Sequence, residues 1–241
     1  TAAPTASAGV DATICSTSVF NTNGSATVGS TLAWSTSGTG TFTNGDSLDA
    51  VYTPSAVDII AGTVTLTLSV TGNGVCSSSS ITDEVVLTIN AAPVANAGVA
   101  SAAICYGQTL SVSGSSSNGS VSWTSTGSGT FSSLTSDSTI YSPSSADNNN
   151  TNVTLTMTVT GSGACSTESI SDSFVLTMSP PATANAGPAT ANICAGTTFT
   201  LTGSASNGSI LWSTSGTGTF NNATIATPTY NPSAADITSG N

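Results

Sequence analysis

The sequence predicts an all-β protein made of three tandem domains, and three observations predict it. Landmark residues recur every 89 positions, among them Trp34, Trp123 and Trp212. Apolar residues alternate with Thr over 64–70 and 153–159, which is the period of a half-buried strand. No window of 11–18 residues carries a 3.6-residue apolar period with good helix formers. Because the repeat is close in length to an immunoglobulin-like sandwich, we expect immunoglobulin-like (PKD-like) β-sandwich domains in an elongated array.

The register of the repeat sets the domain boundaries. We expect domains over 1–92, 93–181 and 182–241, with Pro- and Ala-rich junctions that limit flexibility. The third repeat lacks the counterpart of 64–76 and of the strand after it, so we expect it to be incomplete and the array to be longer than this chain. The other recurring landmarks are Tyr52, Tyr141 and Tyr230; Pro54, Pro143 and Pro232; and Asp58, Asp147 and Asp236.

Each repeat reads as a series of short strands. An early strand is expected at 109–114 and 198–203, and a middle strand opens at each Trp-containing segment. In the strand 64–70, Val64, Leu66, Leu68 and Val70 should face the core, with Thr65, Thr67 and Ser69 facing outward. The strand 84–89 should follow a turn. One short helical turn is possible at 55–58, 144–147 and 233–236.

The composition excludes several classes of function. The 241 residues include no Lys, Arg or His and 11 acids, so the formal net charge is −11, while Ser and Thr supply 44 residues each. Binding to nucleic acid or to an anionic membrane needs cations, so neither a nucleic-acid partner nor direct membrane insertion is expected. Without His or Lys, a Ser–His pair, a Schiff base and an imidazole metal site are impossible. We therefore expect a protein that is not an enzyme and has no resident cofactor.

The five cysteines occur at two positions per repeat. Their use in acidic β-domains without metal-site spacing indicates an oxidising, extracytoplasmic compartment. We favour pairing within each repeat, Cys15–Cys76 and Cys105–Cys165, with the partner of Cys194 beyond the chain end. In ordinary sandwich order, however, Cys15 lies in the first turn of its domain and Cys76 in the last turn. These two turns lie at opposite ends of a sandwich. The alternative is therefore Cys15–Cys165, across the junction between domains.

The tryptophans and the recurring aspartates each have a structural and a functional interpretation. Each Trp is expected in the core on a middle strand, rather than on an exposed platform for sugars. Asp58, Asp147 and Asp236 are expected to cap a turn. Calcium ligation is the alternative, although no short loop gathers several carboxylates. Asp83 and Glu84 are adjacent in an expected strand and should point to opposite faces.

The combined motifs carry a resemblance to a known class of proteins. The strings NAG-x-A-x-x-x-I-C, W-x-x-x-G-x-G-x-F, Y-x-P-S-x-x-D and T-L-T-x-x-V-T-G-x-G-x-C cover essentially the whole chain. They resemble the repeats of very large cell-surface adhesins of Bacteroidetes, most closely the gliding-motility adhesins. The resemblance implies an extracellular, filamentous protein on the bacterial cell surface, exported by the type IX secretion route. It also implies O-glycosylation at Asp-Ser/Thr-x strings, which makes Ser47 and Ser138 candidates.

The expected function is that of a structural stalk segment of an adhesin filament that supports surface attachment and gliding. Its partners would be neighbouring repeats of the same chain, the secretion and motility machinery, and external surfaces or polysaccharide. Two alternatives stay open. One is an array of carbohydrate-binding modules, which would need several exposed aromatic side chains on one face. The other is a self-assembling filament subunit, in which a strand from a neighbour completes the third domain.

Overall fold

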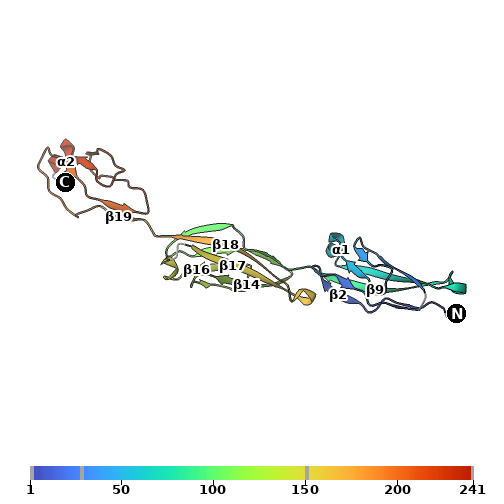
Figure 1. Ribbon diagram of the computed structural model, residues 1–241. Coiled ribbons are helices and arrows are strands. Elements are labelled where there is room, and N and C mark those ends of the chain that lie inside the picture. Colours follow the sequence, from blue (N-terminus) through green and yellow to red (C-terminus); the bar gives the residue numbers. More distant parts are fainter. Residues whose placement is uncertain (1–2, 28–29, 150–151, 240–241) are drawn as a thin grey trace.

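The computed structural model describes residues 3–27, 30–149 and 152–239. It shows three β-rich units in a row, with the two chain ends at opposite ends of the molecule (Figure 1). Each sheet takes its strands from one of the three expected ranges, which we call unit 1 (1–92), unit 2 (93–181) and unit 3 (182–241). The predicted all-β, immunoglobulin-like array is confirmed.

Unit 1 folds as two facing sheets with a small accessory pair of strands. Its main sheet has the order β2-β9-β8-β5, its second sheet the order β3-β7-β6, and β1 pairs with β4. The first strand of the main sheet, β2, runs parallel to the last, β9, while the other neighbours are antiparallel. In chain order the elements are β1 (Ala6–Ser7), β2 (Ala12–Cys15), β3 (Phe20–Asn21), β4 (Ser25–Ala26), β5 (Thr31–Thr36), β6 (Thr41–Thr43), β7 (Val51–Thr53), α1 (Ala56–Ala61), β8 (Thr63–Thr71), η1 (Gly74–Cys76) and β9 (Ser80–Asn90).

Unit 2 repeats this topology. Its main sheet has the order β11-β18-β17-β14, its second sheet β12-β16-β15, and β10 pairs with β13. Strand β11 is again parallel to the last strand, β18. The elements are β10 (Val94–Asn96), β11 (Ser101–Cys105), β12 (Leu110–Ser113), β13 (Ser115–Ser117), β14 (Gly119–Ser125), β15 (Thr130–Phe131), β16 (Ser138–Ser142), η2 (Asp147–Asn149), β17 (Asn152–Gly161), η3 (Gly163–Cys165) and β18 (Ser169–Ser179).

Unit 3 contains the second sheet and the accessory pair. Strands β20, β23 and β22 form the sheet, and β19 pairs with β21. Within its described residues, the segments equivalent to β11 and β14 are not paired in a sheet. The elements are β19 (Thr183–Asn185), β20 (Phe199–Thr200), β21 (Ser204–Ser206), β22 (Thr219–Phe220), β23 (Thr229–Asn231) and α2 (Ala234–Ser239).

The core of each complete unit comes largely from one long hairpin, β8–β9 in unit 1 and β17–β18 in unit 2. The predicted alternation in 64–70 is confirmed, since its four apolar residues are buried and its Thr and Ser side chains are partly exposed. In unit 2, seven of the twelve buried core residues come from the hairpin, namely Val153, Leu155, Met157, Val159, Phe174, Leu176 and Met178. The hairpin is therefore the largest single contributor to apolar burial.

Candidate functional site

The junction between units 1 and 2 is closed by a disulfide. Cys15, the last residue of β2, bonds to Cys165, the last residue of η3, with a Cα–Cα distance of 4.8 Å. Both residues are buried. The favoured pairings, Cys15–Cys76 and Cys105–Cys165, are therefore wrong, and the alternative across the junction is the one that the structure contains.

Strand direction explains this pairing. Because β2 is parallel to β9, Cys15 lies beside Asn90, where the chain leaves unit 1. Cys76 lies in η1, before the start of β9 at Ser80. The eleven residues of β9 from Ser80 to Asn90 span about 33 Å, far more than the roughly 7 Å Cα–Cα limit of a disulfide. The turn of the next unit, η3, is by contrast packed against β2 and β9.

Hydrogen bonds made by residues of unit 1 and of unit 2 also hold the chain at this junction. Ser16 N donates to Asn90 O at 2.8 Å, and Ala92 N donates to Ser16 Oγ at 3.0 Å. From unit 2, Asn118 Nδ2 donates to Ala92 O at 2.9 Å. The Cys165 Sγ lies 3.4 Å from Asn90 O. The junction is thus anchored by the backbone, by side chains and by a covalent bond.

The junction between units 2 and 3 repeats two of these hydrogen bonds without the covalent bond. Tyr106 N donates to Ser179 O at 2.9 Å, and Asn207 Nδ2 donates to Pro181 O at 3.2 Å. Cys105 occupies the place that Cys15 has in unit 1, and its thiol is exposed and in no disulfide. The thiol of Cys194 is also exposed. The partner expected for Cys194 beyond the chain end stays a prediction.

A buried aspartate stabilises one loop of each unit, and in unit 1 this loop lies at the same end as Cys15. In unit 1, Asp58 is 1% exposed and its carboxylate accepts hydrogen bonds from Ser55 N (2.9 Å), Thr39 N (2.9 Å) and the Tyr52 hydroxyl (2.8 Å). Ser55 Oγ in turn accepts from Asp58 N, which completes a capping box at the start of α1. Asp147 and Asp236 make the same contacts in their own units. The short helical turn expected at these positions is confirmed as α1, η2 and α2.

These contacts control the ionisation of the carboxyl groups. Burial alone raises the pKa of Asp58, but the N–H groups of Ser55 and Thr39 and the Tyr52 and Ser55 hydroxyls outweigh it and bring the pKa to about 2. Burial, together with the nearby Asp58 carboxylate, raises the pKa of Tyr52. The aspartate therefore stays ionised and the tyrosine stays a hydrogen-bond donor at neutral pH.

The three aspartates act as turn caps. Each lies in a different unit, and each carboxylate is held by donors of its own unit. Calcium ligation by Asp58, Asp147 or Asp236 would compete with three hydrogen bonds each. Across residues 3–27, 30–149 and 152–239, no group of three or more Asp, Glu, Cys or His side chains could hold a metal ion.

The G-x-G motif next to each Trp strand fits around this cluster. A Cβ on Gly38 would overlap the Asp58 carboxylate, and a Cβ on Gly40 would overlap the Tyr52 hydroxyl. Gly127 and Gly129 have the same neighbours, Asp147 and Tyr141, in unit 2. Glycine is needed at these positions because the loop backbone passes directly against the buried carboxylate and the tyrosine hydroxyl.

The three Trp side chains occupy equivalent positions, but their burial differs. Trp34 is 7% exposed and Trp123 2%, so the predicted core role is confirmed in units 1 and 2. The indole N–H of each Trp donates to a backbone carbonyl thirteen residues later. Trp212 is only partly buried. The buried indoles of units 1 and 2 offer no sugar-stacking face.

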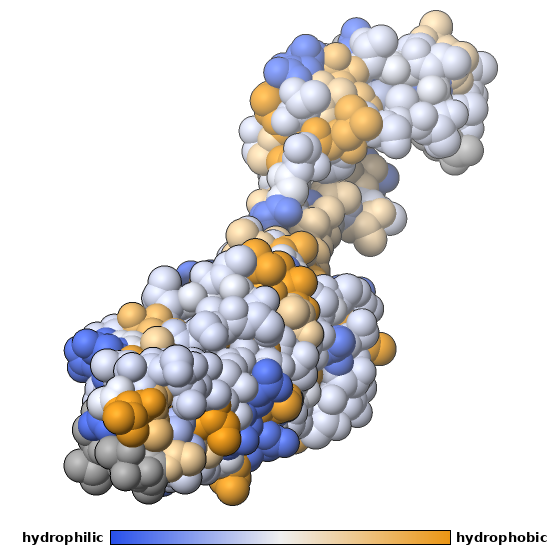
Figure 2. Space-filling model, turned by 90° about the vertical axis from the view of Figure 1, so that its right-hand side faces the viewer, coloured by the Kyte–Doolittle hydropathy of each residue, from blue (hydrophilic) through white to orange (hydrophobic). Residues whose placement is uncertain are grey.

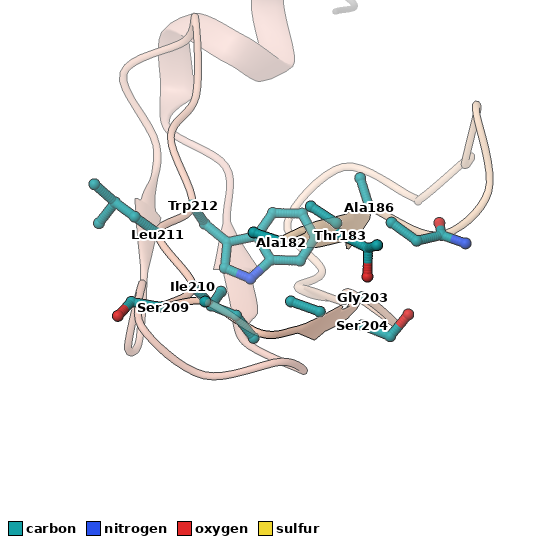
Figure 3. Close-up of a pocket in the computed structure, with 13 residues that line it drawn as sticks. Ala182, Thr183, Ala186, Gly203, Ser204, Ser209, Ile210, Leu211 and Trp212 are labelled. Atoms are coloured by element: carbon teal, nitrogen blue, oxygen red, sulfur yellow. The ribbon is translucent and has the colours of Figure 1, made fainter. Parts of the chain in front are cut away.

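A hollow of about 300 Å³ lies beside Trp212 in unit 3. In Figure 3 its indole ring projects towards the segment containing Ala182 and Thr183, whereas the Leu211 side chain points away. A second hollow, of about 430 Å³, lies between 191–195, Tyr230 and α2. Sequence reasoning predicted an incomplete third domain but did not identify these hollows.

The glycosylation candidates lie in the same region of units 1 and 2 but not at equivalent positions, since the counterpart of Ser47 is Ser136. Ser47 is partly buried, and its backbone carbonyl accepts the Trp34 indole N–H. Ser138 is exposed at the start of β16. Modification of either residue stays a prediction.

One long-range contact was missed by sequence reasoning. Asp83 in β9 accepts a hydrogen bond from Ala8 N at 2.7 Å, and Asp172 in β18 accepts one from Ala97 N at 2.8 Å. Each hydrogen bond connects the segment before β2 or β11 to the last strand of the same unit. The recurrence of Asp83 and Asp172 was the available signal, but nothing in the sequence identified the partner. Glu84, as expected, points the other way and is exposed.

Neither helix in the described part of the chain is long and apolar enough to cross a membrane.

No family model and no curated protein matches the chain. Similar solved structures include human CDH23 EC21-23 (13% identity, TM-score 0.49, covering 96% of this chain and 90% of that one) and Drosophila N-cadherin EC1-4 (16%, 0.45, 75% and 50%). Protocadherin Gamma B2 extracellular cadherin domains 3-6 give 13% identity and a TM-score of 0.41, covering 73% of this chain and 47% of that chain. The chain thus spans about half the length of the Protocadherin Gamma B2 and Protocadherin gammaB7 structures that it matches.

Proposed function

We propose that this chain is a stalk segment of an extracellular adhesin filament, in which the repeats provide mechanical reach. The observation that carries the proposal is the Cys15–Cys165 bond across the junction between units 1 and 2. A spacer must keep its units in line and must survive tension. A covalent bond between neighbouring units serves both requirements, whereas a bond within a unit stabilises that unit alone.

The path of force supports this interpretation. The disulfide joins residues separated by 150 positions, so tension that enters from the N-terminal side reaches Cys15 and crosses directly to Cys165. Strand β18 follows Cys165 and lies outside the covalent loop, but the strands between Cys15 and Cys165, including β8, β9 and β17, lie inside it. Those strands can lose their hydrogen bonds, but their chain cannot be drawn out while the bond is intact.

The surface also suits a spacer outside the cell. All 11 ionisable acids carry the same sign, and no cation is present to pair with them, so neighbouring filaments repel each other. Most of the face seen in Figure 2 has intermediate hydropathy, and its hydrophobic spots are small and separate. Such a surface disfavours lateral aggregation.

The finer part of the proposal rests on the resemblance of the repeat motifs. We infer a bacterial cell-surface location, export by the type IX route, and a role in attachment and gliding, with the secretion and motility machinery and external surfaces or polysaccharide as partners. Glycans on Ser47 and Ser138 belong to the same proposal.

Two experiments test the two levels of this proposal. Small-angle scattering of the 241-residue chain should give a radius of gyration well above the roughly 18 Å of a compact globule of this length. Antibodies raised against units 1 and 2 should label intact cells of the organism that encodes the chain, and deleting the repeats should reduce surface attachment. A compact particle would overturn the spacer role, and labelling only after lysis would overturn the surface location.

A further inference from the structure

We propose that the Cys15–Cys165 bond joins two extended segments, 8–15 and 165–179, into one covalent strap that carries axial tension past the folded bodies of units 1 and 2. The strap keeps both units folded under a load that would otherwise pull their sheets apart. The inference uses the same disulfide as the proposed spacer role. It concerns how tension is distributed inside the units, however, and does not depend on the adhesin role.

The first half of the strap is an extended segment of unit 1. Ala8 N donates to the Asp83 carboxylate at 2.7 Å, and β2 then runs parallel to β9 until Cys15 lies opposite Asn90. The contacts along this segment keep a constant offset of 75 residues between it and β9. Because β9 is an extended strand, a segment that keeps this register is extended too, and tension lengthens it little.

The second half of the strap contains strand β18 of unit 2. This strand follows the turn that holds Cys165, has eleven residues from Ser169 to Ser179, and ends where the chain leaves the unit. The turn packs against β2 and β9, so β18 starts near the place where β2 ends (Figure 1). The disulfide therefore connects the two extended segments end to end along the row of units.

Without the disulfide, tension would cross a parallel strand pair in each unit. Load that enters unit 1 along β2 would leave it through β9, and load that enters unit 2 along β11 would leave it through β18. The paired residues are Ala12–Cys15 in β2 and Ser101–Cys105 in β11. Pulling the opposite ends of such a pair shears its backbone hydrogen bonds, and their failure would expose the hairpins that supply the cores.

With the disulfide in place, both strand pairs are unloaded. Tension reaches Cys15 along β2 and leaves unit 1 through the sulfur atoms, so β9 carries none of it. In unit 2 the tension enters at Cys165 and follows β18, while β11 and β17 only flank the loaded strand. The strap is much shorter than the backbone route between its two ends. Residues 16–164 are therefore a slack branch, which bears no tension while the strap is intact.

The position of the bond protects this route. Cys15 is 3% exposed and Cys165 is 0% exposed, and the turn η3 covers the end of the main sheet of unit 1. A thiol reductant needs access to one of the two sulfur atoms, so it must first open the junction. The strap accordingly stays closed while the junction is folded.

The test holds the full 241-residue chain in an optical trap by handles at its two ends and follows folding with a pair of dyes. The dyes are attached through non-natural residues at Thr31 and Ser80, which are exposed and lie two strands apart in the main sheet of unit 1. These positions are about 10 Å apart in the folded sheet, whereas the chain between them spans about 40 Å as a relaxed coil. Energy transfer between the dyes therefore reports whether unit 1 is folded under load. Dyes at Ser120 and Ser169 report unit 2 in the same way.

We expect energy transfer in the oxidised chain to persist at the force at which the double variant Cys15→Ser/Cys165→Ser loses it. The matched control keeps the disulfide and moves the first handle to Ile60, which is 86% exposed and lies in the slack branch. Tension then passes through the body of unit 1, so transfer there should be lost at a lower force although the bond is unchanged. A compact particle in scattering would contradict the spacer role alone. The strap is ruled out if transfer is lost at the same force from both handle positions, or in the oxidised chain and the double variant alike.

Discussion

Removing the Cys15–Cys165 bond should greatly lengthen the chain under force. In the oxidised protein only the residues before Cys15 and after Cys165 can be drawn out, because the 150-residue separation between the cysteines is bridged by one covalent bond. At about 3.4 Å per extended residue, the hidden length is about 500 Å. The double variant Cys15→Ser/Cys165→Ser, or reduction of the wild type, should release that length.

Single-molecule force spectroscopy with handles at both chain ends measures this difference directly. Cys105→Ser is the matched control, since Cys105 is in no disulfide, and it should extend like the oxidised wild type. In bulk, closing a loop of this size stabilises the folded state by about 5 kcal/mol in the chain-entropy description, so the double variant should also unfold at lower denaturant. Equal total extension of the oxidised wild type and the double variant would refute the proposed force path.

Three further predictions concern the units themselves. Gly38→Ala should lower the thermal stability of unit 1 by about 2 kcal/mol, because the new Cβ overlaps the Asp58 carboxylate, and a melt that matches the wild type would contradict this packing. Because the pKa of Asp58 is lowered in the folded state, its contribution to stability is complete above about pH 4, the pKa of the unfolded state, and is lost as the pH falls towards 2. Denaturant titrations from pH 5 to 2 should show this decline in the free energy of unfolding, and the decline should be smaller in Asp58→Ala. Asp83→Asn should cost about 1–2 kcal/mol by weakening the bond from Ala8 N, whereas the exposed neighbour Glu84→Gln should stay within about 0.5 kcal/mol in the same chemical melt.

The parts of the fold that were predictable depend on local patterns. The alternation in 64–70 specifies which face of β8 is buried, and this needs only the period of a strand. The P-S-x-x-D string specifies a capped turn because Ser55 and Asp58 bond to each other over three residues. A sequence reader can recognise both features without knowing the topology.

The parts that were not predictable depend on strand direction and on distant contacts. The cysteine spacing is compatible with either pairing, and the choice follows from β2 running parallel to β9, which no local pattern encodes. The bond from Ala8 N to Asp83 joins positions 75 residues apart. The partial exposure of Trp212, where Trp34 and Trp123 are buried, is likewise encoded by no local pattern.

The same difference between local and distant contacts implies an order in which the array becomes stable. The Asp58 cluster links residues at most 19 apart and has a formed counterpart in unit 3, where no core hairpin is present among the described residues. The junction disulfide, by contrast, needs β2 of one unit and the finished hairpin turn of the next. Cys15 therefore reaches its partner only after unit 2 has placed β17 and β18 together. The presence of a disulfide across the junction therefore indicates that the following unit has folded. A disulfide within each unit would not indicate this.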